Sequence, residues 1–158
     1  MSFQRHIATG TLFWLLSGSV PLHAADSVWK RIRYQGGTIE AKVNRFDWNT
    51  TLKSYGNHLE LVFAGQKTVK IEAADITALS YGQKAYRRVA DMAALSVVLT
   101  PVALFGILHK SKDHLIGIEY RHAAGEPGGV LLIIHKDEYR EVLTRLREMT
   151  GKPVENWH

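Results

Sequence analysis

The sequence of 158 residues contains no cysteine. Disulfide bonds, a thiolate nucleophile and a cysteine-ligated metal site are therefore excluded. A domain of this length can bury enough surface to fold without disulfides, so their absence is compatible with export to a compartment such as the bacterial periplasm. Hydrophobic residues make up 46% of the chain, which supports a folded core rather than disorder.

Motifs of common catalytic chemistry are also lacking. There is no G-x-S-x-G, no H-E-x-x-H and no phosphate loop ending in G-K-[ST]. The eight histidines lack metal-ligand spacing; His109 and His114, for example, do not form an i,i+4 helical pair. We therefore expect no catalytic residues, no metal and no cofactor. The alternative is an enzyme with a dispersed site, which a pocket with converging polar groups and a nearby histidine would favour.

The formal net charge of the chain is +5. Such a balance suits anionic partners, of which phospholipid headgroups are the first expectation. Nucleic acid is disfavoured as a partner, because a basic composition alone is usually just solvated surface.

Residues 1–24 have the pattern of a cleaved secretory signal peptide. Arg5 supplies the positive start, Ile7 to Val20 form a short apolar core, and Ala24 is a small residue at the cleavage position. This core is shorter than the roughly 20 apolar residues of a spanning helix; an uncleaved N-terminal anchor is the alternative. We predict an exported protein on the periplasmic side of the bacterial inner membrane.

Residues 25–152 are predicted to form one α+β domain, followed by a short tail over 153–158. Alternating or continuous apolar residues between turn signals predict short antiparallel strands. The expected strands cover residues 28–34, 38–46, 52–55, 58–63, 67–71, 76–81, 115–121 and 130–134. Gly36-Gly37 and the run from Gly125 to Gly129 are expected turns between neighbouring strands.

An amphipathic helix is predicted at the end of the domain, over residues 137–149. Its apolar residues recur at helical spacing and form one stripe, which consists of Tyr139, Val142, Leu143, Leu146 and Met149. Asp137 is the expected N-cap and Gly151 the stop signal. A lone helix needs an apolar surface, which a small sheet sandwich or a partly open barrel offers at its end.

This order of strands followed by one helix resembles the pleckstrin-homology superfold, including GRAM domains, over residues 28–150. A second resemblance is local. The stretches ITALSYGQKAYRRV (76–89), KSKDHLIGIEY (110–120) and YREVLTRLREMTGKPV (139–154) are similar to a family of uncharacterised bacterial exported, membrane-associated proteins. The first resemblance implies a fold, and neither implies an activity or a set of binding residues.

The most unusual stretch is an apolar run between the predicted strands 76–81 and 115–121. No residue from Met92 to Leu108 carries a charge, and we interpret residues 89–108 as an apolar helical insertion. As a helix it would be about 30 Å long, enough for a single membrane span. A span would separate the strands on its two sides, so we favour a shallow dip into one leaflet with a bend at Pro101. A buried element or an interface between copies of the chain is the other alternative.

Basic residues flank the run on both sides and are the candidate contacts with an anionic membrane surface or a protein partner. They are Lys84, Arg87, Arg88, Lys110 and Lys112. Because both ends are basic, the positive-inside rule gives a span no direction. We predict an exported, membrane-proximal binding or scaffolding domain. The alternative is a self-assembling structural protein, a homo-oligomer with the apolar run as its interface.

Overall fold

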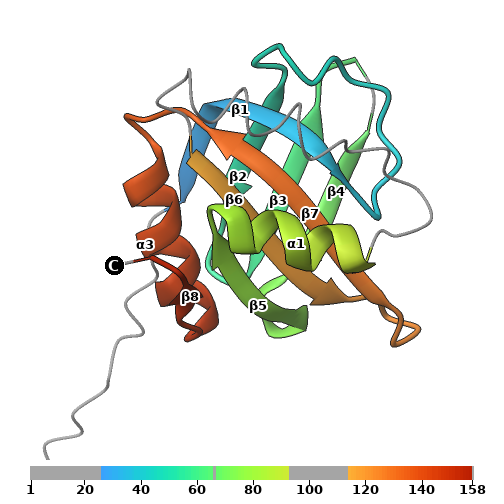
Figure 1. The fold of residues 1–158 in the computed structure, drawn as a ribbon, viewed down its shortest axis with the longest axis vertical. Helices are drawn as coiled ribbons and strands as arrows, with labels where there is room; N and C mark the ends of the chain where they lie inside the picture. Colours follow the sequence, from blue (N-terminus) through green and yellow to red (C-terminus); the bar gives the residue numbers. More distant parts are fainter. Residues whose placement is uncertain (1–25, 66, 93–113, 158) are drawn as a thin grey trace, which may run out of the picture.

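The computed structural model describes residues 26–65, 67–92 and 114–157, which form one sheet with helices packed against it (Figure 1). The strands are β1 (Ser27–Gly37), β2 (Thr50–Ser54), β3 (His58–Phe63), β4 (Thr68–Glu72), β5 (Ile76–Tyr81), β6 (His114–Arg121), β7 (Pro127–Ile134) and β8 (Val154–Glu155). The helices are the short 3-10 turn η1 (Ala73–Asp75), α1 (Gln83–Met92) and α3 (Tyr139–Thr150). The predicted α+β class and C-terminal amphipathic helix are confirmed.

The sheet is open and mixed, with the strand order β4-β3-β2-β1-β7-β6-β5-β8. Two antiparallel meanders, β1 to β4 and β5 to β7, are joined by the antiparallel pairing of β1 with β7. The short strand β8 runs parallel to β5, with Val154 beside Leu79. A purely antiparallel sheet was expected, and this is wrong, because residues of the predicted tail form a parallel strand at one edge.

The predicted hairpin at Gly36-Gly37 and the strand over 38–46 are wrong. β1 continues through both glycines, which pair with Leu131 and Val130 of β7. Gly37 has φ +145°, and a Cβ there would lie 2.1 Å from the carbonyl oxygen of Gly129, so only glycine fits this close approach. Residues 38–49 have no strand pairing. Ile39 is nevertheless buried, which means that the alternation marked an inward-facing side chain but not a paired strand.

The sheet buries apolar side chains on both faces. In the larger core, side chains from the strands β1 through β7 pack against Val142, Leu143 and Leu146 of α3. A smaller cluster, formed by Ala85, Val89, Leu115, Leu131 and Ile133, lies between α1 and the strands β6 and β7. Because both faces of β7 are covered, its sequence reads as a continuous apolar run rather than an alternating one.

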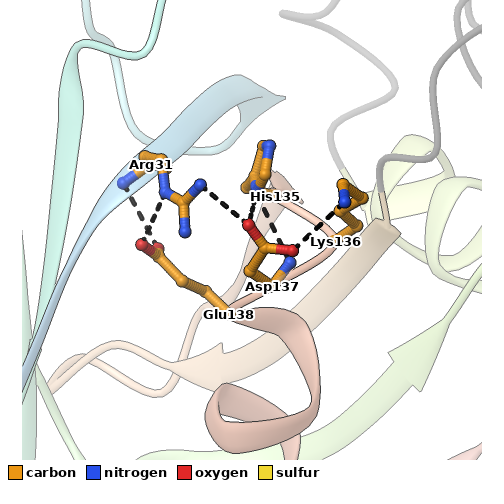
Figure 2. Close-up of polar contacts among 5 residues, drawn as sticks. All are labelled: Arg31, His135, Lys136, Asp137 and Glu138. Carbon is orange, nitrogen blue, oxygen red and sulfur yellow. Dashed lines mark hydrogen bonds and ion pairs between the residues drawn. The ribbon is translucent and has the colours of Figure 1, made fainter.

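The start of α3 is fastened to β1 by charged side chains (Figure 2). Arg31 donates from Nε to Glu138 at 2.9 Å and pairs through Nη1 with Asp137 at 3.1 Å. Glu138, not Asp137, is the N-cap residue, and its side chain makes no capping bond. The predicted N-cap at Asp137 is therefore wrong, because its carboxylate is engaged by Arg31 and also contacts Lys136 and His135. The predicted stop at Gly151 is confirmed by its left-handed φ of 67°.

The apolar insertion predicted over 89–108 falls mostly outside the described residues. Its first residues, Val89 to Met92, form the last turn of α1, a helix that begins at Gln83. Within residues 26–65, 67–92 and 114–157, no helix is both long enough and apolar enough to cross a bilayer.

Candidate functional site at α1 and the ends of the apolar segment

Helix α1 is an amphipathic helix that lies across β6 and β7 (Figure 1). Its buried residues Ala85 and Val89 face the sheet. Gly117 of β6 permits this close approach, since a Cβ at that position would lie 3.1 Å from Ala85 and 2.7 Å from the hydroxyl of Ser80. The helix is therefore part of the folded domain, and its polar side carries the basic residues predicted as contacts.

Two of these basic residues are engaged in ion pairs on the domain itself. Lys84 pairs with Glu155 of β8. Arg88 lies between two carboxylates: its Nη1 is 2.7 Å from Glu155, and its Nη2 donates to Glu119 at 3.1 Å. Glu119 is only 8% exposed, and a buried carboxylate needs a charged partner. Lys84 and Arg88 therefore fasten α1 to β6 and β8.

Two residues of this cluster, Glu155 and Arg88, have pKa values shifted by their partners. The hydrogen bond from Lys84, together with that from Arg88, holds the pKa of Glu155 below its ordinary value of 4.5. The hydrogen bond to Glu119 is the largest cause of the raised pKa of Arg88. Both shifts favour the charged forms, so Glu155 and Arg88 stay ionised at neutral pH.

Of the three remaining predicted contacts, the structure describes only Arg87. Arg87 is exposed on α1, and among the described residues it forms no ion pair. Lys110 and Lys112 lie outside the described residues. Of the five predicted contacts, Arg87 is thus the one that the structure describes as a cation open to a partner, and the contact itself stays a prediction.

The chain on both sides of the segment 93–113 belongs to the same folded domain. Before the segment, α1 packs on β6 and β7; after it, β6 begins at His114 and pairs with both β5 and β7. β1, far earlier in the chain, pairs with β7. A single membrane crossing would place β1–β5 and β6–β8 on opposite sides and break these pairings. The two flanks therefore lie on one side of any membrane that the segment touches.

A pocket of about 370 Å³ lies at one end of β5, beside the position where the chain returns at His114. It is lined by Tyr81, Tyr139, Arg140, Asn156 and Trp157. We call it the aromatic pocket.

Next to the aromatic pocket, the ring of His114 stacks on Tyr139 with ring centroids 3.4 Å apart. His114 Nδ1 shares a 2.5 Å hydrogen bond with the hydroxyl of Tyr81. Burial raises the pKa of Tyr81, and the neighbouring Tyr139 raises it further, so its phenol stays protonated at neutral pH. The hydroxyl of Tyr139 in turn accepts a 2.9 Å hydrogen bond from Arg140.

This pocket was missed by sequence reasoning. Its residues come from β5, α3 and the C-terminal stretch, and the stacked histidine comes from β6, so only the folded sheet brings them together. Polar groups that converge beside a histidine are the feature expected for a site with a small ligand. In the part of the chain that the structure describes, no cluster of three or more histidine and carboxylate side chains is placed to hold a metal ion.

Comparisons with known proteins assign no family to this chain. No family model matches the chain, and no curated protein is similar to it. Among solved structures, the Spt16D Pob3N heterodimer is similar to 86% of this chain and 60% of the matched chain, with 12% sequence identity and a TM-score of 0.48. The chain thus spans less than two thirds of that matched chain, and the likeness assigns neither family nor function.

Proposed function

We propose that this protein is a pleckstrin-homology-like binding or scaffolding domain, exported and held at the periplasmic side of the inner membrane. In this proposal the part of the apolar insertion 89–108 that follows α1 dips into one leaflet and returns. The strand order supports the fold: two meanders joined through β1 and β7, followed by α3 with its apolar stripe in the main core, follow the pleckstrin-homology order of strands and then a helix.

The observation that carries the proposal is the position of the two flanks on one sheet. An uncharged run from Met92 to Leu108, placed in the chain between α1 and β6, has to be covered by lipid, by a protein partner, by a second copy of the chain or by the rest of this domain. With a bend at its centre, each leg has about nine residues, or about 14 Å of helix, which enters one leaflet but does not cross the bilayer.

The basic residues divide into two groups within this proposal. Lys84 and Arg88 are engaged by Glu119 and Glu155 and hold α1 in place. Arg87, Lys110 and Lys112 are the cations proposed to meet anionic headgroups. Each cation near such a surface contributes about 1 kcal/mol, so removal of three is expected to weaken binding by about two orders of magnitude at low salt.

The test is co-sedimentation of the signal-free chain with vesicles of neutral lipid and of neutral lipid mixed with anionic lipid. We expect stronger binding to the anionic vesicles. The triple variant Arg87→Gln, Lys110→Gln, Lys112→Gln is expected to lose this preference but to keep its fold by circular dichroism.

A matched control removes the same charge elsewhere on the surface, through Lys30→Gln, Lys67→Gln and Arg121→Gln. All three residues are exposed. If the control and the triple variant bind anionic vesicles equally, the basic-flank proposal is wrong. The other outcome is that the wild-type chain binds neither kind of vesicle and forms oligomers in sedimentation velocity. In that case self-assembly through the apolar segment replaces the membrane proposal.

The aromatic pocket favours a second candidate function, the binding of a small molecule. Tyr81, Arg140 and Asn156 converge there, with His114 hydrogen-bonded to Tyr81. An enzyme with a dispersed site would have such an arrangement. The chemistry of this pocket is specific enough to name the class of ligand.

A further inference from the structure

We infer that the aromatic pocket binds a small organic anion, one that joins a carboxylate to a ring with an apolar face, such as an aromatic or sugar carboxylate. The inference rests on three features of the lining residues: the charge, the shape of the walls and the backbone at Asn156. It does not depend on membrane binding.

The charge at the pocket comes from Arg140. Its Nε donates to the hydroxyl of Tyr139, and no described carboxylate pairs with its guanidinium. The five lining residues include no acid. The nearest carboxylate in sequence to Asn156 is Glu155, and that side chain is held by Lys84 and Arg88. A guanidinium without a carboxylate partner binds a carboxylate through charge-assisted, directional hydrogen bonds.

The walls of the pocket are aromatic. Tyr81 and Tyr139 are nearly parallel, with an angle of 22° between their planes and 6.2 Å between their ring centroids. His114 stacks on both rings and holds Tyr81 through the hydrogen bond at Nδ1. Trp157 adds a third aromatic side chain to the lining. Rigid aromatic surfaces of this kind stack on the apolar face of a ligand ring at little cost in side-chain entropy.

The backbone at Asn156 is the third feature. Within the described residues, Asn156 is the one non-glycine residue with positive φ, at 64°. Asparagine tolerates this conformation better than most residues, and such positions are often found at binding sites. Here the turn after β8 brings Asn156 and Trp157 to the pocket together. The volume of about 370 Å³ falls within the range of small-molecule sites.

The inference is tested by titrating the signal-free chain with four probes and following the indole signal of Trp157 by NMR. Benzoate carries both the ring and the carboxylate, benzamide has the ring alone, acetate has the carboxylate alone, and glucuronate replaces the aromatic ring with a sugar. Trp157→Phe identifies the signal by removing it. We expect saturable shifts with benzoate or glucuronate and binding at least about tenfold weaker with benzamide and acetate.

Two variants link binding to the pocket. Arg140→Gln is expected to weaken benzoate or glucuronate binding by about tenfold, since it removes the charge but keeps much of the side-chain volume. Arg121→Gln is the control, because Arg121 is likewise exposed but lies at the other end of β6. It is expected to bind as the wild type does.

The outcomes distinguish an aromatic acid from a sugar acid, and both from results that would overturn the inference. Benzoate alone supports an aromatic acid, and glucuronate alone supports a sugar acid. Equal binding of benzamide and benzoate would show that charge is not recognised and would overturn the inference. So would an unchanged Trp157 signal with every probe, or equal losses in Arg140→Gln and Arg121→Gln.

Discussion

Glu155 is the residue on which two cations of α1 converge. Lys84 and Arg88 both pair with its carboxylate, and Glu155 itself lies in β8, at the edge of the sheet. This one side chain therefore connects the C-terminal end of the domain to the helix that leads into the apolar segment. Its ion pairs are partly exposed to solvent, so their contribution is best measured through its dependence on pH.

Replacing Glu155 by Gln is expected to flatten the acid branch of the stability profile. The folded-state pKa of Glu155 lies below 4.5, so the unfolded chain takes up this proton first as the pH falls. The stability that depends on the charged carboxylate is present above pH 4.5 and is lost as the pH falls through the lower, folded-state pKa. Urea unfolding at several values between about pH 5 and about pH 3 measures this slope.

Glu126→Gln is the matched control for this experiment. Glu126 is an exposed glutamate in the turn between β6 and β7, and it forms no ion pair with a described residue. The control is expected to keep the slope of the wild type. If both variants show the same profile, the ion pairs of Glu155 contribute nothing to acid stability.

At the scale of elements, the docking of α1 depends on the missing side chain at Gly117. A Cβ at this position would meet Ser80 at 2.7 Å and Ala85 at 3.1 Å, in a region where neither neighbour is exposed. Gly117→Ala is expected to cost about 1–3 kcal/mol of unfolding free energy, because overpacking has to push the helix away from the sheet. Chemical denaturation measures this cost.

The double variant Gly117→Ala, Ser80→Ala removes the shorter of the two contacts and is expected to recover part of the loss. Gly56→Ala is the control, since nothing lies within 4 Å of a Cβ there; its effect is expected to stay within about 0.5 kcal/mol. A Gly117→Ala protein as stable as the control would mean that α1 does not pack on β6 as described.

The elements also show what the sequence could predict. The strand over 76–81 and the stripe of α3 were predicted correctly, because alternation and helical spacing are local signals. The double glycine at 36–37 was wrongly predicted as a hairpin turn. Its role is to permit a close approach between β1 and β7, which no local sequence pattern reveals. Strand register likewise decides that Arg88 meets Glu119 and that Tyr81 meets His114, and register across distant segments was not predictable from spacing.

At the scale of the whole molecule, the central claim is that the chain before and after the apolar segment forms one domain, so that both parts lie on the same side of any membrane the segment touches. The pairing of β1 with β7 and of β5 with β6 supports it, because these strands come from both sides of the segment. The membrane proposal and the self-assembly alternative both require this topology, whereas a single span is incompatible with it.

The most direct test is cysteine labelling, and because the chain has no cysteine of its own, only an introduced cysteine can react. Lys67 precedes the apolar segment and Glu126 follows it, and both are exposed. Each residue is changed to cysteine in a separate variant. Intact spheroplasts are then treated with a maleimide that does not cross the inner membrane. Labelling of lysed cells is the control that both cysteines can react. We expect Lys67→Cys and Glu126→Cys to be labelled equally in intact spheroplasts. Labelling of only one of them would show that the segment crosses the membrane and would contradict the fold described above.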